Sequence, residues 1–183
     1  GMGAPQSQIL AINCLLATKE TLKGRAFTAN RLDQVDEAAE DQAERLVHTV
    51  HAWFVLESGL KRLFDGLKEY KDTNLGQGIA GIRKLREMQP DRLADMAQKL
   101  DAFLPGAMED ARAFVGKLAD KRMVREVCDK AADLFVEEFE SAERIVIGLD
   151  ETILAEQGEE LEEGMLLRDV FPRTSDEIKV LLS

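Results

Sequence analysis

Residues 32–67 decide the fold, and they read LDQVDEAAEDQAERLVHTVHAWFVLESGLKRLFDGL. Steps of three and four residues along this stretch pick out one set of eleven positions, of which nine are apolar. The set consists of Leu32, Val35, Ala39, Gln42, Leu46, Thr49, Trp53, Leu56, Leu60, Leu63 and Leu67. An α-helix returns side chains to one face at this period, so the pattern predicts a long amphipathic helix from Asn30 to about Tyr70. A partner helix must cover its apolar face.

Similar patterns predict helices on both sides of this stretch. Apolar residues at helical spacing indicate a first helix over residues 6–23 and a third over residues 78–104. Pro90 must kink the third helix or start a new one, because its ring removes an amide and crowds the preceding turn. Residues 104–106, Leu-Pro-Gly, are expected to reverse the chain into a fourth helix that runs from Ala107 to Leu149.

The last helix is short and has a recognisable beginning. Thr174-Ser175-Asp176-Glu177 fits a capping box, in which the Thr hydroxyl accepts from the Glu amide and the Glu side chain reaches back. It predicts a helix that ends near Leu182. No segment has the length and alternation of a β-strand.

The predicted fold is therefore all-α: an elongated up-and-down helical bundle with coiled-coil-like packing, four main helices and a short C-terminal helix. With 183 residues, of which 45% are hydrophobic and 5% aromatic, the chain suits one helical domain over residues 1–183. Residues 1–5 are interpreted as a tag remnant and flexible start, and residues 150–173 as an acidic, weakly structured segment.

Charge is distributed unevenly. The chain has a net charge of −11, and residues 137–163 hold eleven acids against one base, Arg144. This balance argues against a nucleic-acid partner, and it suggests that the tract from Glu137 to Glu163 could face a basic protein. Basic clusters at Lys61-Arg62, Arg83-Lys84-Arg86 and Lys121-Arg122-Arg125 are interpreted as solvated helix surface.

Neither a transmembrane segment nor a secretory signal is predicted, so the protein is expected to be cytoplasmic. Cys14 and Cys128 both lie in apolar helical patterns, which favours reduced, buried thiols. Residues 2–7, MGAPQS, fit the permissive pattern for myristoylation at Gly3, and the sequence leaves this open.

Two motifs resemble known binding sites, but the residues around them lack the features that such sites need. Residues 76–81, GQGIAG, match the dinucleotide fingerprint, yet a polar run precedes them where a buried strand is needed, so they predict a connection between helices. His48 and His51, with Glu44, share one helix and could begin a metal site. Both histidines fall outside the apolar stripe and no Glu-x-x-His occurs, so exposed or interface histidines are favoured.

No catalytic, cofactor-binding or metal-ligating residue is predicted. Cys128 could pair with a histidine as a nucleophile, but its apolar surroundings favour a packed thiol. We expect a non-enzymatic protein-interaction or scaffolding module acting through helical surfaces. The alternative is a ligand-sensing or metal-binding bundle with a pocket near Trp53, Phe54 and His51. An enzyme with a novel helical site is a third hypothesis.

The expected assembly is a homodimer. The third helix is too short to cover the second half of the fourth, which is still apolar. Only the early part of the second helix or another chain is long enough to cover it, and a second copy is the favoured cover. These surplus apolar residues are Leu134, Phe135, Phe139, Ala142, Ile145, Val146 and Leu149.

Overall fold

The computed structural model describes residues 5–23, 29–74, 78–157 and 166–183, in which helices are present and strands are not. This confirms the all-α prediction. The α-helices are α1 (Gln6–Leu22), α2 (Ala29–Glu57), α3 (Lys61–Thr73), α4 (Pro90–Phe103), α5 (Ala107–Phe114), α6 (Lys121–Gln157), α7 (Leu167–Val170) and α8 (Ser175–Leu181). The short 3₁₀ helices are η1 (Ile79–Lys84), η2 (Arg86–Met88) and η3 (Leu104–Gly106).

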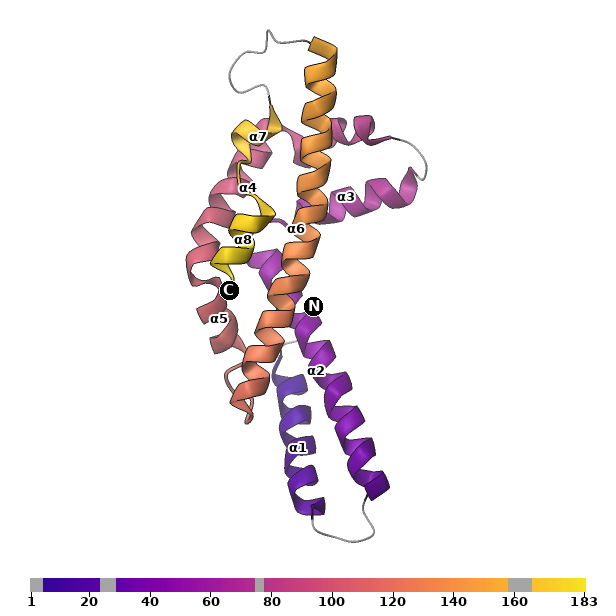
Figure 1. Ribbon diagram of the computed structural model, residues 1–183, viewed down its shortest axis with the longest axis vertical. Helices are drawn as coiled ribbons and strands as arrows, with labels where there is room; N and C mark the ends of the chain where they lie inside the picture. The colour runs from indigo at the N-terminus through magenta and orange to yellow at the C-terminus, as the bar shows by residue number, and fades with distance from the viewer. Residues whose placement is uncertain (1–4, 24–28, 75–77, 158–165) are drawn as a thin grey trace.

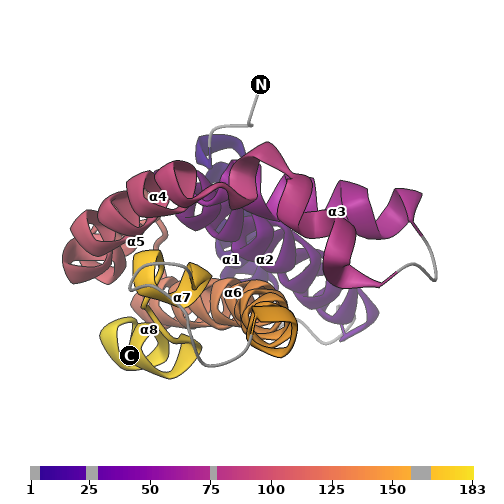
Figure 2. The same ribbon diagram turned by 90° about the horizontal axis from the view of Figure 1, so that it is seen from above.

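The molecule is elongated, and α6 is its central element (Figure 1). At one end α1 and α2 form an antiparallel hairpin, and α2 also packs against α6. The chain then runs out along α3, returns through η1 and η2, and descends through α4 and α5 beside α6. Seen from above, α3 and α4 lie along one side, and α6 with α7 and α8 lies along the other (Figure 2).

The predicted single helix over residues 30–70 is wrong, because the chain turns a corner between α2 and α3. Gly59 adopts a φ of +77°, which breaks the helix. The buried Ser58 hydroxyl donates to the Val55 carbonyl over 3.2 Å and so satisfies the end of α2. The apolar period hides this corner, since Leu60 and Leu63 beyond it enter the same core as Leu46 before it.

The predicted third helix corresponds to η1, η2 and α4 in the structure, and the predicted fourth helix corresponds to α5 and α6. Of the two options for Pro90, the structure shows a start: Pro90 is the first residue of α4, where its missing amide costs nothing. The predicted reversal at residues 104–106 is wrong, because Leu104 is right-handed helical (φ −54°, ψ −43°) and η3 leads straight into α5. The reversal lies at residues 115–120, between α5 and α6.

The C-terminal part follows the bundle closely. The capping box that begins α8 is confirmed, with Thr174 Oγ1 accepting from the Glu177 amide at 3.2 Å. Within the acidic segment, α6 is helical as far as Gln157 and α7 begins at Leu167. Residues 158–165 lie outside the described part of the chain, as do residues 2–4 of the myristoylation pattern, including Gly3.

Phe135 occupies the centre of the core. It is fully buried, with ring centroids 5.9 Å from Phe54, 6.3 Å from Phe64 and 6.4 Å from Phe103. The partly buried Trp53 ring stacks on Phe114 and also contacts Phe54 and Phe103. Three phenylalanine rings therefore pack against Trp53, in the region where the alternative hypothesis placed a ligand pocket.

The premise of the homodimer prediction is also wrong. Within one chain, the surplus of α6 is covered by α2, η1, α7 and α8 rather than by a second copy. Phe139 is fully buried and stacks on Phe171, with centroids 5.7 Å apart. Of the two covers that the sequence allowed, the structure shows the second helix rather than another chain. The cover by α7 and α8 was missed because residues 150–173 were expected to be weakly structured.

Candidate functional site

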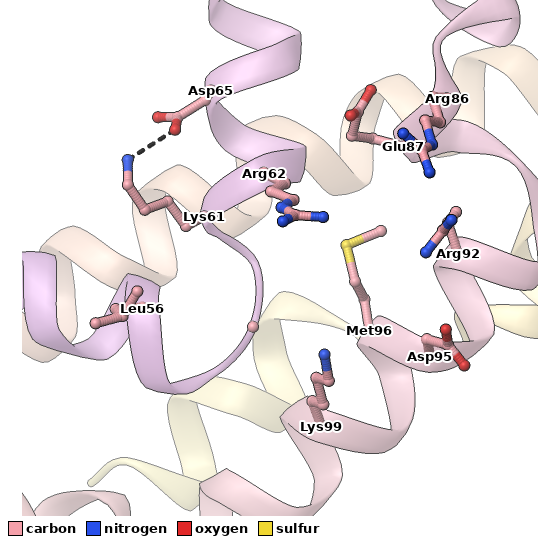
Figure 3. A pocket seen from close by; sticks show the side chains of 11 residues that line it. Leu56, Lys61, Arg62, Asp65, Arg86, Glu87, Arg92, Asp95, Met96 and Lys99 are labelled. Carbon is pink, nitrogen blue, oxygen red and sulfur yellow. Dashed lines mark hydrogen bonds and ion pairs between the residues drawn. The ribbon is translucent and has the colours of Figure 1, made fainter.

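A groove opens on the outside of the bundle where α2, α3 and α4 meet. Its volume is about 480 Å³, and charged side chains from α3, η2 and α4 surround it (Figure 3). The lining residues are Leu56, Gly59, Lys61, Arg62, Asp65, Arg86, Glu87, Arg92, Asp95, Met96 and Lys99. Among them are five bases and three acids, in a chain whose net charge is −11.

Gly59 brings the two walls of this groove together. A Cβ built on Gly59 would lie 2.9 Å from Cδ and 3.2 Å from Cβ of Lys99, so the corner backbone runs directly against α4. On α4 itself, Arg92, Met96 and Lys99 recur at helical spacing and line the groove, and Met96 is buried, as are Leu93 and Leu100 of the same helix. The amphipathic period of α4 therefore sets the position of these side chains.

The basic side chains converge, and the acidic ones largely do not. Figure 3 shows Arg62, Arg86 and Arg92 pointing towards the open space beside Met96. Lys61 and Asp65 turn away together and form an ion pair of 2.7 Å. Arg62, Arg86 and Lys99 make no ion pair with any residue that the structure describes. The lining of the groove thus carries more positive than negative charge.

The groove continues along α3. A second hollow of about 670 Å³ shares Arg62, Asp65, Arg86 and Glu87 with the first and extends to Asn74. Since α3 has 13 residues, the two hollows together follow roughly 20 Å of helix. The far hollow adds another acid, Glu69, so the groove is basic at the Gly59 end and more acidic at the Asn74 end.

The histidines lie elsewhere, between α2 and α6. His48 is exposed, and His51 Nε2 lies 2.9 Å from Oε2 of Glu138. With Leu134, Glu137 and Ser141 they line a shallow hollow of about 340 Å³. Across the residues described, no three His, Cys, Asp or Glu side chains are grouped as a metal site requires.

The two thiols differ. Cys128 is buried in the core as predicted, and burial raises its pKa to about 11 because it disfavours the thiolate. Cys14 is exposed on α1, so the prediction of two buried thiols is wrong for it. Neither forms a disulfide.

The fingerprint-like glycines connect helices as predicted, as far as they are described. Gly76 and Gln77 lie outside the described residues, while Gly78 is extended and leads into η1. The Tyr70 hydroxyl of α3 donates to the Gly78 carbonyl over 3.1 Å, which ties the connection to α3. A helix precedes this motif, where dinucleotide binding requires a strand.

The groove was not predicted from the sequence. The basic clusters Lys61-Arg62 and Arg83-Lys84-Arg86 were expected to be separate solvated surfaces, whereas in the structure Arg62 and Arg86 line one hollow. The available signal was the Ser58-Gly59 pair, which marks a break in an otherwise helical period.

Nearly the whole chain matches one known protein family. Residues 2–182 match the family described as Conserved Oligomeric Golgi complex subunit 6, C-terminal. The chain belongs to this family. It is similar to the "Conserved oligomeric Golgi complex subunit 6" of Phaeosphaeria nodorum, with 36% identity over all of this chain and 26% of the relative. The relative from Chaetomium globosum is 37% identical over 98% of this chain and 26% of its own length.

The chain thus spans about a quarter of the length of the relatives it matches. No solved structure matches it. The relatives' names describe a subunit of an oligomeric Golgi complex, and these names overturn two expectations. They contradict the homodimer that we expected, and they contradict the simple cytoplasmic location. Within the described residues, no helix has the length and apolar character to cross a membrane.

The names of the relatives contradict the expected partners, which were a second copy and a basic protein at the tract from Glu137 to Glu163. Several of its acids bind within the chain instead. Glu138 approaches His51, Glu143 pairs with Arg168 over 3.2 Å, and Asp150 accepts two backbone amides.

Proposed function

We propose that this chain is a helical interaction module within a subunit of an oligomeric Golgi complex. It acts by presenting helix surfaces to other polypeptides of that complex, and it carries out no catalysis. The observation that supports this most strongly is the family match, which covers residues 2–182 and so includes every helix of the bundle. The relatives bear the name of a complex subunit and not of an enzyme.

The architecture suits such a role. One core joins residues of α1 to α8, so the outer faces keep fixed positions relative to one another. A fixed scaffold reduces the ordering cost of binding, because its contact side chains are already positioned. The groove along α3 supplies a recessed contact surface.

A domain replacement tests this proposal. In Phaeosphaeria nodorum, the matching quarter of subunit 6 can be replaced by this chain, with an affinity tag on another subunit of the complex. We expect the hybrid subunit to co-purify with the complex at the level of the natural one. A hybrid with Phe139→Asp, which places a charge in the core, serves as the unfolded control and should be lost.

If the hybrid subunit accumulates in the cell, shows helical circular dichroism when purified, and is still absent from the isolated complex, the chain is not an interaction module of this assembly.

A further inference from the structure

We propose that the groove along α3 binds an acidic amphipathic segment of another polypeptide. Its carboxylates would lie on Arg62, Arg86 and Lys99, and one of its apolar side chains on Met96. This inference rests on the proposed function and deepens it, because it names the chemistry of one partner.

The unpaired basic side chains of the groove favour an acidic occupant. Lys61 is already paired with Asp65, and Arg92 lies 3.9 Å from Asp91. Arg62, Arg86 and Lys99 have no such partner within the described residues, and they surround one hollow. Like charges held around one space repel each other, and an acidic occupant relieves this repulsion. Two of the three are arginines, whose planar guanidinium groups bind carboxylates through paired hydrogen bonds.

The floor of the groove is the second argument, because it is apolar. Met96 lies between the basic side chains and is 7% exposed, so it offers a small apolar contact, and Leu56 at the rim is 40% exposed. Methionine adapts its shape to different apolar side chains, which suits a binding surface. The occupant therefore needs apolar groups as well as negative charge.

This combination favours a polypeptide over a membrane surface. A lipid phosphate would gain nothing from Leu56 and Met96, which an apolar side chain of a peptide could contact. A peptide side chain can enter the hollow while its neighbours bind the rim.

The length of the groove is the third argument. The two adjoining hollows follow α3 for roughly 20 Å, the length of a helix of about 13 residues. Binding of an amphipathic helix in such a groove is a common mode of peptide recognition. Because Glu69 joins Asp65 and Glu87 at the far end, the occupant should be acidic near Gly59 and basic near Asn74.

Fluorescence anisotropy with a designed peptide tests the inference. The probe is a fluorescein-labelled helix of Leu, Ala and Glu with a final turn of Lys, and its scrambled form is the peptide control. We expect the 183-residue chain to bind the probe, and Arg62→Glu with Lys99→Glu to weaken binding at least about tenfold. Arg125→Glu with Lys130→Glu reverses two exposed bases on α6, outside the groove, and should change binding less than about twofold.

Three results would overturn the inference. The first is equal binding of the scrambled peptide, and the second is unchanged binding by the groove variant. The third is groove-dependent binding to phosphatidylcholine vesicles with about a tenth phosphatidylinositol phosphate, without peptide binding.

The two proposals fail separately. If the hybrid subunit enters the complex but the chain does not bind the probe, the proposed function stands and the groove inference is wrong. If the chain binds the probe but the hybrid stays outside the complex, the reverse holds.

Discussion

Gly59 has the conformation on which the geometry of the groove depends. Its φ of +77° is readily available only to glycine, and its backbone lies against Lys99. The corner at this residue directs α3 away from the axis of α2 and so creates the wall opposite α4. A single residue therefore connects the local backbone to the candidate binding surface.

We expect Gly59→Ala to lower the free energy of unfolding by about 1–3 kcal/mol, since alanine is strained at this φ and its Cβ would crowd Lys99. Urea denaturation followed by circular dichroism measures the change. Gly78→Ala is the matched control, because Gly78 has a φ of −65° and open space around it. Equal stability of the Gly59→Ala variant and the wild type would contradict the strained corner.

The two cysteines should differ in reactivity. At pH 8, iodoacetamide should modify Cys14 in the folded chain and leave Cys128 unmodified, because Cys128 is buried and its pKa of about 11 keeps it a thiol. Mass spectrometry of tryptic peptides measures both sites. Both should react in denaturant, and rapid labelling of Cys128 without denaturant would show that its place in the core is wrong.

At the scale of elements, a network of acids on α6 holds the C-terminal helices. Asp150 accepts the amides of Leu167 and Arg168 at 2.8 and 3.0 Å, where α7 begins. Glu143 binds the Arg168 guanidinium at 3.2 Å and the Ser175 amide at 3.0 Å, where α8 begins. These bonds explain how two short helices remain attached to a long one.

Asp150→Ala removes both acceptors and leaves a buried amide without its partner. We expect a loss of about 2–3 kcal/mol and faster hydrogen exchange in residues 167–182, with exchange in α1 unchanged. Glu151→Ala is the control, since the neighbouring Glu151 side chain is exposed. Unaltered exchange of residues 167–182 in the Asp150→Ala variant would show that α7 and α8 are held by apolar packing alone.

The sequence predicts the elements unevenly, for physical reasons. The helical period and the capping box at Thr174 are local properties, so the helices and the beginning of α8 were predictable. The corner at Gly59 was missed because the apolar period stays in phase across it. The groove was missed because Arg62 and Arg86 meet only after α3, η1 and η2 have folded back, which no local pattern encodes.

At the scale of the whole molecule, Phe135 joins α6 to the helices around it. Phe135→Ala should lower the free energy of unfolding by about 3–5 kcal/mol, because the rings of Phe54, Phe64 and Phe103 cannot all collapse into the space it leaves. Trp53→Ala should cost less, since Trp53 is only partly buried. Urea denaturation of both variants gives the comparison, and the opposite order would place the centre of the core at Trp53.

The central claim is that this chain folds as one helical module and engages a partner through the groove along α3. Hydrogen–deuterium exchange of the chain, alone and within the hybrid subunit of the assembled complex, tests it most directly. We predict slow exchange in α2 and α6 in both states, and further protection of α3 and α4 only in the complex. Rapid exchange of α6 in the isolated chain, or unchanged exchange of α3 and α4 after assembly, would contradict the account.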